Sequence, residues 1–442
     1  MWTTTSPAPP LAAPASVSGA DLHALVRRLY PLCRSITGDG VRQTLSILRE
    51  YLPALQVHEV PTGTPVLDWQ VPLEWNIRDA WVKDSQGQRV IDFRQHNLHV
   101  LGYSQPVAGW FSLAELKEHL YSLPEQPDLI PYRTAYYAET WGFCLSHNQL
   151  LALNEDQYEV GIDSTLAPGA LTYGELLLPG ELEEEVLLSC HICHPSLAND
   201  NLSAIAVATF LAQHLSQAPR RYSYRLVFAP GTIGAITWLA LHPAAVGRIR
   251  HGLVLSLLGD AGAFTYKKSR RGTADIDRAL ALVLREAAVP HHVVEFSPYG
   301  YDERQYCSPG FNLPVGCLSR TPYGQFPEYH TSADNLDLVQ PAALAGSLHL
   351  LQAVLAVLEA DRYYQNLHPY GEPALGRRGL YRTVSGSPAP PGWQLALLWV
   401  LNLSDGQHSL LSIAERAGLP FEQVRHAAEV LTAHDLLLPL SA

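Results

Sequence analysis

Two histidines and an aspartate lie close together in the segment from residue 191 to residue 203, His-Ile-Cys-His-Pro-Ser-Leu-Ala-Asn-Asp-Asn-Leu-Ser. Imidazole nitrogens and carboxylate oxygens are common zinc ligands in proteins, so His191, His194 and Asp200 are candidate ligands of a metal ion. A structural role is the alternative, because Asp and Asn oxygens also cap helices and a buried histidine can be satisfied within a core. Further candidate ligands elsewhere in the chain favour the metal site.

This segment lies where a strand is expected to end and a helix to begin. Residues 186–190 form a short apolar run after three glutamates, which predicts a buried strand. Residues 203–215 are rich in Ala and Leu and contain no Gly or Pro, which predicts a helix. Because ligands of α/β sheets collect at the carboxyl ends of the strands, this junction suits a metal site.

Two later residues extend the set of candidate ligands. The apolar run 252–258 predicts a strand that ends beside Asp260. His330 lies in a polar loop ahead of a helix that is expected over residues 341–358. Each is weak evidence alone, but together with the first segment they form an ordered series of His, Asp, Asp and His at strand ends and in adjacent loops.

With this series the chain resembles the co-catalytic zinc aminopeptidase fold. It resembles more closely a bacterial aminopeptidase-like family that carries a small winged-helix tail and is often encoded beside polysaccharide or natural-product biosynthesis genes. The similarity covers the chain from about residue 20 to its end. The segments that carry the closer resemblance are 34–38, 71–75, 132–134, 141–144, 302–306 and 329–332.

The resemblance implies a role for each candidate ligand. By position, His191 and Asp260 would bind one zinc ion, Asp200 would bridge, and His330 would hold the other site. His194 would either replace His191 as the ligand or orient water beside the metal. The implied cofactor is zinc, as one or two ions, and the implied reaction is the hydrolysis of an amide bond by water that the metal activates.

The expected substrate is a small aminoacyl or peptide-like biosynthetic intermediate. An arginine would bind an anionic end of it, a glutamate its amine, and tyrosines would donate hydrogen bonds; a surface or structural role is the alternative for each. The candidate catalytic residues are His194, Glu303 and Tyr329, and the candidate substrate-binding residues are Arg133, Arg304 and Tyr306.

The chain departs from that family at Gly231. It has Pro-Gly-Thr-Ile-Gly where the closer family has Pro-Glu-Thr-Ile-Gly. If the missing glutamate is a metal ligand, a single zinc ion is expected; if it is the general base, the reaction loses a group that typically contributes roughly 10²–10⁴-fold. Asp302, Glu303 or Glu328 could substitute for it. The alternative function is therefore a catalytically degenerate metal-binding scaffold with a role in assembly.

Composition narrows the partners of the 442-residue chain. With 30 basic and 42 acidic residues the net charge is −12, which repels phosphate backbones, so we expect no nucleic-acid partner.

No run approaches 18 uninterrupted apolar residues, which predicts no membrane span. The six cysteines show no framework spacing and the first residues lack an export signal, so a cytoplasmic protein with reduced thiols is expected. Homo-oligomer formation is left open.

The predicted fold class is α/β, a zinc-aminopeptidase-like mixed sheet flanked by helices, with a β-rich insertion and a C-terminal winged-helix domain. The insertion is expected either to wall the active-site cleft or to contact another subunit. The predicted parts are a disordered tail (1–19), a catalytic domain (20–62 and 133–375), the insertion (63–132), a linker (376–391) and the winged-helix-like domain (392–442).

The charge of the winged-helix-like domain argues against DNA binding. From residue 392 onward there are two arginines against five acidic residues, whereas a recognition helix ordinarily needs a basic face. We therefore expect this domain to pack against the catalytic domain or a neighbouring subunit.

Overall fold

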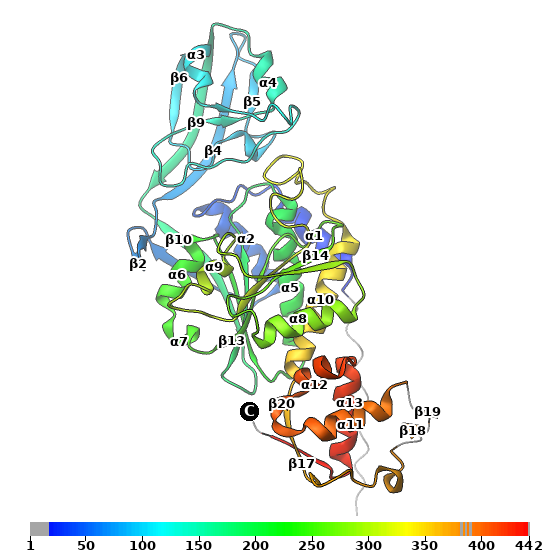
Figure 1. The fold of residues 1–442 in the computed structure, drawn as a ribbon. Helices are drawn as coiled ribbons and strands as arrows, with labels where there is room; N and C mark the ends of the chain where they lie inside the picture. The colour runs from blue at the N-terminus through cyan, green and yellow to red at the C-terminus, as the bar shows by residue number, and fades with distance from the viewer. Residues whose placement is uncertain (1–16, 381–382, 385–386, 389–390, 441–442) are drawn as a thin grey trace, which may run out of the picture.

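The computed structural model describes residues 17–380, 383–384, 387–388 and 391–440. Residues 1–16 of the predicted tail and several residues of the predicted linker (376–391) therefore lie outside the described residues. Figure 1 shows three parts that follow one another along the molecule: a β-rich part at one end, an α/β domain in the middle and a small helical part at the other end.

A mixed eight-stranded sheet forms the centre of the α/β domain, in the order β1-β10-β12-β11-β13-β16-β14-β15. The middle strands β12, β11, β13 and β16 are parallel, and β10 and β14 run antiparallel to them on either side. The carboxyl ends of the parallel strands therefore meet at one edge. The strands are β1 (Gln56–Pro61), β10 (Ala170–Leu178), β11 (Glu185–His191), β12 (Ser223–Ala229), β13 (Ile249–Leu255), β14 (Phe264–Lys267), β15 (His291–Val294) and β16 (Val315–Ser319).

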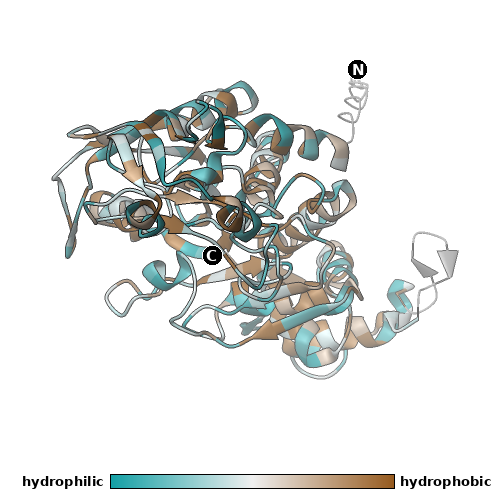
Figure 2. Ribbon diagram, turned by 90° about the horizontal axis from the view of Figure 1, so that it is seen from above, coloured by the Kyte–Doolittle hydropathy of each residue, from teal (hydrophilic) through white to brown (hydrophobic). Residues whose placement is uncertain are grey.

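Helix α5 is the central helix against this sheet. Ten of its 13 residues are buried because its sequence is almost entirely apolar, and it contacts β11, β12, α1, α2 and α10. Figure 2 shows hydrophobic residues gathered on the inner strands and helices and hydrophilic residues on the outer loops. The helices of this domain are α1 (Gly19–Leu29), α2 (Asp39–Tyr51), α5 (Ala204–Ser216), α6 (Ile233–Leu241), α7 (Pro243–Val246), α8 (Asp275–Glu286), α9 (Glu303–Tyr306) and α10 (Pro341–Ala360).

Helix α10 is, within the described part of the chain, the one helix long and apolar enough to cross a membrane by length and composition. In the structure 56% of that stretch is buried, and α10 packs against α1, α5 and α8. Its apolar residues therefore contribute to the hydrophobic core of the α/β domain.

The β-rich insertion is built on a four-stranded antiparallel sheet in the order β5-β4-β9-β6. Strand β9 pairs with both β4 and β6, so it belongs to the insertion. The insertion therefore extends beyond its predicted end at residue 132. The elements are β2 (Pro65–Val66), β3 (Trp69–Gln70), β4 (Glu74–Lys83), β5 (Arg89–Asp92), η1 (Asn97–His99), β6 (Val107–Ser112), α3 (Leu113–Lys117), β7 (Leu120–Tyr121), β8 (Phe143–Cys144), α4 (His147–Ala152) and β9 (Gln157–Ala167).

The C-terminal part combines three helices with a small sheet in the order β20-β17-β21. Strand β17 precedes the predicted linker, so this part begins before residue 392. It packs on α8, where Arg278 donates to Glu415 at 2.9 Å and the Phe421 backbone N–H donates to Glu286 at 2.9 Å. The elements are β17 (Tyr363–Asn366), η3 (Leu375–Arg378), β18 (Thr383–Val384), β19 (Ser387–Pro388), α11 (Trp393–Leu403), β20 (Asp405–Ser409), α12 (Leu410–Ala417), α13 (Phe421–Ala433) and β21 (Leu437–Pro439).

The structure confirms the predicted fold class, a mixed α/β sheet with an inserted β-rich part and a helical C-terminal domain. The predicted strand at residues 186–190 is β11 and the predicted helix at residues 203–215 is α5. The strand predicted over residues 252–258 ends earlier, at Leu255, and this difference matters for the site described below.

A buried ion-pair cluster spans three strands of the central sheet. Arg225 of β12 donates to Glu185 of β11 at 2.9 Å and to Glu175 of β10 at 2.5 Å, and all three side chains are less than a tenth exposed. Trp238 donates to the same Glu175 carboxylate at 2.8 Å. Buried charges are tolerated only when paired, so removal of Arg225 would leave two buried carboxylates without their shared cation.

We predict that Arg225→Met destabilises the protein by about 3–5 kcal/mol, because it leaves buried carboxylates without their shared cation. The measurement is the free energy of unfolding from urea denaturation. Arg78→Met is the matched control, since Arg78 forms an exposed ion pair with Asp163, and we expect it to have little effect. Equal stability of the Arg225→Met variant and the wild type would contradict the structural role of the cluster.

Candidate metal centre

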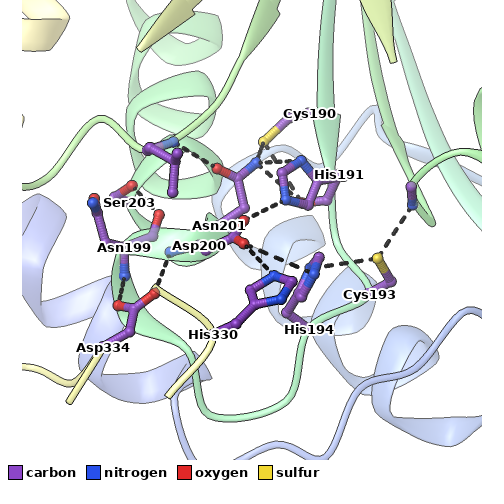
Figure 3. Close-up of polar contacts among 12 residues, drawn as sticks. Cys190, His191, Cys193, His194, Asn199, Asp200, Asn201, Ser203, His330 and Asp334 are labelled. Atoms are coloured by element: carbon purple, nitrogen blue, oxygen red, sulfur yellow. Dashed lines mark hydrogen bonds and ion pairs between the residues drawn. The ribbon is translucent and has the colours of Figure 1, made fainter. Parts of the chain in front are cut away.

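The predicted segment lies at the carboxyl edge of the central sheet. His191 is the last residue of β11, His194 follows in the connecting loop, and Asp200 lies in the short irregular helical segment η2 (Ala198–Ser203) that leads into α5. His330 lies in the loop before α10. Figure 3 shows the three imidazoles turned toward the Asp200 carboxylate.

The distances within this group are short. The Nε2 atom of His191 lies 2.7 Å from Asp200 Oδ1, and the Nε2 atom of His330 lies 3.2 Å from Asp200 Oδ2. The Nε2 atom of His194 is 3.9 Å from Asp200 Oδ2. Ligand atoms of His191, His194 and Asp200 all lie within 4.8 Å of one another. Three imidazoles and one carboxylate supply the four donors that zinc usually takes, so the residues present fit this ion.

Electrostatics favour the protonation states that a metal requires. Burial lowers the pKa of His194 to about 3, which keeps its imidazole neutral. Burial tends to raise the pKa of Asp200, but the imidazoles of His194, His191 and His330 outweigh it and hold that pKa well below its usual value. Metal ligands must be neutral imidazole and ionised carboxylate, and the group provides both.

Surrounding residues hold the ligands in place. Asp334 is fully buried and accepts hydrogen bonds from the backbone N–H groups of Asn199 (2.6 Å) and Asp200 (2.9 Å), and burial raises its pKa to about 7. The side-chain amide of Asn201 lies 3.1 Å from His191 Nδ1, so Nε2 is the nitrogen turned toward Asp200. Arg34, 1% exposed, donates from Nε to the backbone oxygen of His194 at 2.9 Å.

Asp260 is the predicted ligand that the structure does not bring into this group. Strand β13 ends at Leu255 and the chain then turns at Leu257, whose φ is 54°, so Asp260 lies off the end of the strand. Its carboxylate accepts from Asn199 at 3.1 Å and from the Thr321 hydroxyl at 2.6 Å. In this position Asp260 supports the loop that carries Asp200. No hydrogen bond or ion pair joins its carboxylate to the three histidines.

Tyr301 lies where a side chain at Gly231 would be. A Cβ atom added at Gly231 would lie 2.6 Å from Tyr301 Cε1 and 2.8 Å from its hydroxyl oxygen. The Tyr301 ring stacks on His191 with 3.8 Å between ring centroids. The absence of a side chain at position 231 therefore makes room for an aromatic wall directly against the candidate metal centre.

Of the three predicted substitutes for a glutamate at position 231, Glu303 and Asp302 are buried, and Glu328 is partly buried in the loop that carries His330. Glu303 is fully buried, forms an ion pair with Lys267 and accepts from the Tyr301 backbone N–H at 3.0 Å. It lines a second cavity of about 630 Å³, which Tyr301 also lines. Asp302 is 1% exposed, and burial raises its pKa to about 8.

The remaining predicted residues differ in their burial and in their contacts. Tyr329 stacks on His330 with 3.9 Å between ring centroids, so it supports one ligand. Tyr306 is fully buried in the core, where its hydroxyl lies 2.9 Å from that of Ser189. Arg133 is exposed and lies over the ring of Tyr121, and Arg304 lines the main cavity.

A cavity of about 950 Å³ adjoins the candidate metal centre. His194 and His330 line it from the centre, and Tyr301 and Arg304 line it from the α9 side. The insertion and the segment that follows its predicted end contribute Trp69, Tyr132, Thr134, Tyr136 and Tyr137. The insertion therefore walls the cleft, which was one of its two expected roles.

Several residues of this site escaped sequence reasoning. Tyr301 lies directly before the 302–306 segment that carried the resemblance, yet only the structure shows its ring on His191. Asp334 lies in the same polar loop as His330, and its position four residues after a candidate ligand was the available signal. Arg34 was part of a quoted segment, but its contact with His194 joins residues 160 positions apart.

Comparisons with known proteins agree with this architecture. Residues 23–361 match a family described as "Domain of unknown function (DUF4910)", and residues 362–439 match the winged helix-turn-helix family. A protein of Clostridium acetobutylicum is 49% identical over 422 residues, which cover 96% of this chain and 97% of that protein. Its name provisionally describes a polysaccharide biosynthesis protein with an aminopeptidase-like domain.

Two solved structures define the fold similarity. A crystal structure from Clostridium acetobutylicum, provisionally described as a peptidase, matches with a TM-score of 0.91 at 47% identity over 96% of both chains. A zinc aminopeptidase of Bacillus subtilis matches with a TM-score of 0.57 at 11% identity, covering 76% of this chain and 94% of that chain. At that identity the second match shows a shared fold.

We predict that Asp200→Asn lowers the zinc content of protein purified without added zinc from about one ion per chain to near zero, because the central anionic donor is lost. Asp260→Asn is the isosteric control and should leave the zinc content unchanged. Elemental analysis of the purified variants provides the measurement. Loss of zinc from Asp260→Asn with an unchanged melting temperature would contradict the placement of Asp260 outside the ligand group.

The contact between Gly231 and Tyr301 predicts an energetic coupling between these positions. Gly231→Ala should destabilise the protein by about 1–3 kcal/mol through overpacking against the Tyr301 ring, and by much less in a Tyr301→Ala background. The four proteins of this double-mutant cycle are compared by urea denaturation. Additive effects would show that the two positions do not compete for the same space.

Proposed function

The chain belongs to the family described as "Domain of unknown function (DUF4910)", with an aminopeptidase-like domain and a C-terminal winged helix, and from this premise we propose that it is a zinc-dependent amide hydrolase. Its substrate is a small aminoacyl or peptide-like intermediate of polysaccharide or natural-product biosynthesis. The name of the Clostridium acetobutylicum relative supports this biosynthetic setting. The single observation that carries the proposal is the convergence of three imidazoles on the buried Asp200 carboxylate.

One zinc ion is the proposed occupancy. The described residues around Asp200 supply three imidazoles and one carboxylate, and a catalytic zinc site takes three protein ligands and keeps a fourth position open, so three of these four side chains would suffice. Two ions would need further carboxylates, but Asp260 accepts hydrogen bonds elsewhere and Gly231 has no side chain. When bound, zinc supplies a Lewis acid that polarises a carbonyl oxygen and lowers the pKa of a coordinated water.

The residues of the chain would position the substrate and exclude bulk water. His330 is the most exposed ligand, with a third of its side chain accessible, and it faces the cavity together with His194. An amide that enters the cavity therefore meets the centre from the His330 side. Tyr301 lines the same cavity and covers His191 by stacking on it, so His194 and His330 are the imidazoles that face the cavity.

A catalytically silent metal-binding scaffold is the second candidate. Gly231 and Tyr301 favour it, because an aromatic ring occupies the space beside the centre that a glutamate side chain at position 231 would need. Hydrolysis then lacks a nearby carboxylate to accept a proton from water, and Glu303 is already paired with Lys267. The acidic C-terminal domain would serve assembly, and we propose no nucleic-acid partner for it.

We propose a cytoplasmic location for either function. All six cysteines are free, and Cys193 lies next to His194, with 3.5 Å between its sulfur and the Nδ1 atom. Reduced thiols beside a metal centre are compatible with a reducing compartment.

The hydrolase proposal predicts zinc-dependent turnover of at least one substrate in a panel of aminoacyl amides. Chelation should abolish turnover and added zinc should restore it. His330→Ala should lower kcat by roughly 10²-fold or more, comparable with the loss of a general acid or base, without changing the melting temperature appreciably. His349→Ala is the matched control, because it removes an exposed imidazole from α10.

The same assay distinguishes the two candidates. No turnover by the wild type across the panel, together with turnover by the double variant Gly231→Glu/Tyr301→Ala, would support the silent scaffold. In that variant the carboxylate has the room that the Tyr301 ring occupies in the wild type. Turnover by the wild type that is insensitive to chelation and to His330→Ala would contradict both candidates.

A further inference from the structure

The cavity beside the metal centre is basic although the chain as a whole is acidic. The protein carries a net charge of −12, yet the charged lining residues of this cavity, other than its histidines, are Arg270 and Arg304. No described residue that lines it is Asp or Glu. A cleft lined by one sign of charge attracts ligands of the opposite sign.

Arg304 is unusual because one nitrogen of its guanidinium is buried without a partner. Its Nε atom has no hydrogen-bond partner among the described residues. Burial raises the pKa of the neighbouring Asp302 carboxyl and the Arg304 charge lowers it only in part, and no hydrogen bond joins the two residues. A buried donor left unsatisfied is costly, so a site of this kind gains when a ligand supplies the acceptor.

Contacts of the neighbouring residues hold the backbone of Arg304 in place, which limits where its guanidinium can lie. Arg304 belongs to α9, and the neighbouring Glu303 is tied to Lys267 and to the Tyr301 backbone N–H. Arg270 lies on the same cavity, is exposed and donates from Nη1 to Asn312 at 2.9 Å, which leaves its other donors available. Guanidinium groups match carboxylate and phosphate oxygens in a bidentate geometry.

The rest of the lining is apolar and aromatic. Trp69 and Tyr137 lie at its rim, half exposed and with ring centroids 5.7 Å apart, and Phe296 and Ile236 lie on other parts of the wall. Flat apolar groups pack well against such surfaces. The cavity therefore combines an aromatic region, a basic region and the metal centre within about 950 Å³.

We propose that Arg304, assisted by Arg270, forms an oxyanion subsite, and that the substrate is an N-acylated amine that ends in a carboxylate or a phosphate. The aromatic rim holds an apolar or ring-shaped part of the same molecule, and its amide faces His194 and His330. This substrate class rests on the proposed hydrolase function, whereas the anion subsite itself does not require turnover.

The test measures binding with three probes by titration calorimetry or ligand-observed NMR. N-benzoylglycine offers an aromatic ring, an amide and a carboxylate, N-benzoyl-2-aminoethyl phosphate replaces the carboxylate by a phosphate, and N-benzoylglycinamide is the neutral counterpart. We expect at least one anionic probe to bind more tightly than the neutral probe. Arg304→Gln should weaken binding of that anion by about 10- to 100-fold and leave the neutral probe unaffected.

Two controls isolate the contribution of Arg304. Arg271→Gln removes the same charge next to Arg270 but outside the cavity lining, where Arg271 donates to the Asn312 backbone, and it should leave all three affinities unchanged. The zinc content of each variant is measured as well. If Arg304→Gln retains its zinc, an anion that binds the metal directly would keep its affinity in this variant.

The outcomes separate this inference from the proposed hydrolase function. Preference for an anionic probe that disappears in Arg304→Gln supports the subsite even if no amide is hydrolysed, and the carboxylate and phosphate probes then identify the preferred anion. Equal affinity for charged and neutral probes, no binding of either anion, or an Arg304→Gln variant that binds anions like the wild type would overturn it.

Discussion

The contact of Asp200 with three imidazoles is the constraint on which the rest of the site depends. A carboxylate that is 2% exposed and surrounded by His191, His194 and His330 has few ways to be stable. It must either share protons with the imidazoles or bind a cation with them. The surrounding structure holds the carboxylate there, because Asp334 fixes the backbone of its loop and Asn201 fixes the ring of His191.

Tyr301 connects this centre with both neighbouring cavities. Its ring lies on His191, and it lines both the main cavity and the second cavity that contains the Lys267–Glu303 ion pair. Gly231 is what permits this arrangement, since any Cβ there would meet the ring. The glycine at position 231 therefore affects both which side chain lies against His191 and the shape of the cleft.

Local sequence patterns predicted the strand and the helix that position His191, His194 and Asp200, whereas the overall fold class was implied by the family resemblance. The apolar run before His191 and the Ala-rich run after Asp200 each have a clear period and composition, so the strand, the junction and the helix were predictable. Asp260 was placed by the same reasoning, but the strand ends three residues earlier than its apolar run does, and the turn at Leu257 carries the carboxylate away. The stacking of Tyr301 and the contact of Arg34 with His194 join distant segments, and no local pattern encodes them.

The central claim is that one zinc ion binds between these four side chains. Anomalous diffraction at the zinc absorption edge, from crystals of wild-type protein purified without chelator, tests it most directly. The account predicts a single strong peak at about 2.0–2.2 Å from an oxygen of Asp200 and from the Nε2 atoms of at least two of the histidines. No peak at this position after zinc has been supplied, or a peak held by other residues with Asp200 left unligated, would contradict it.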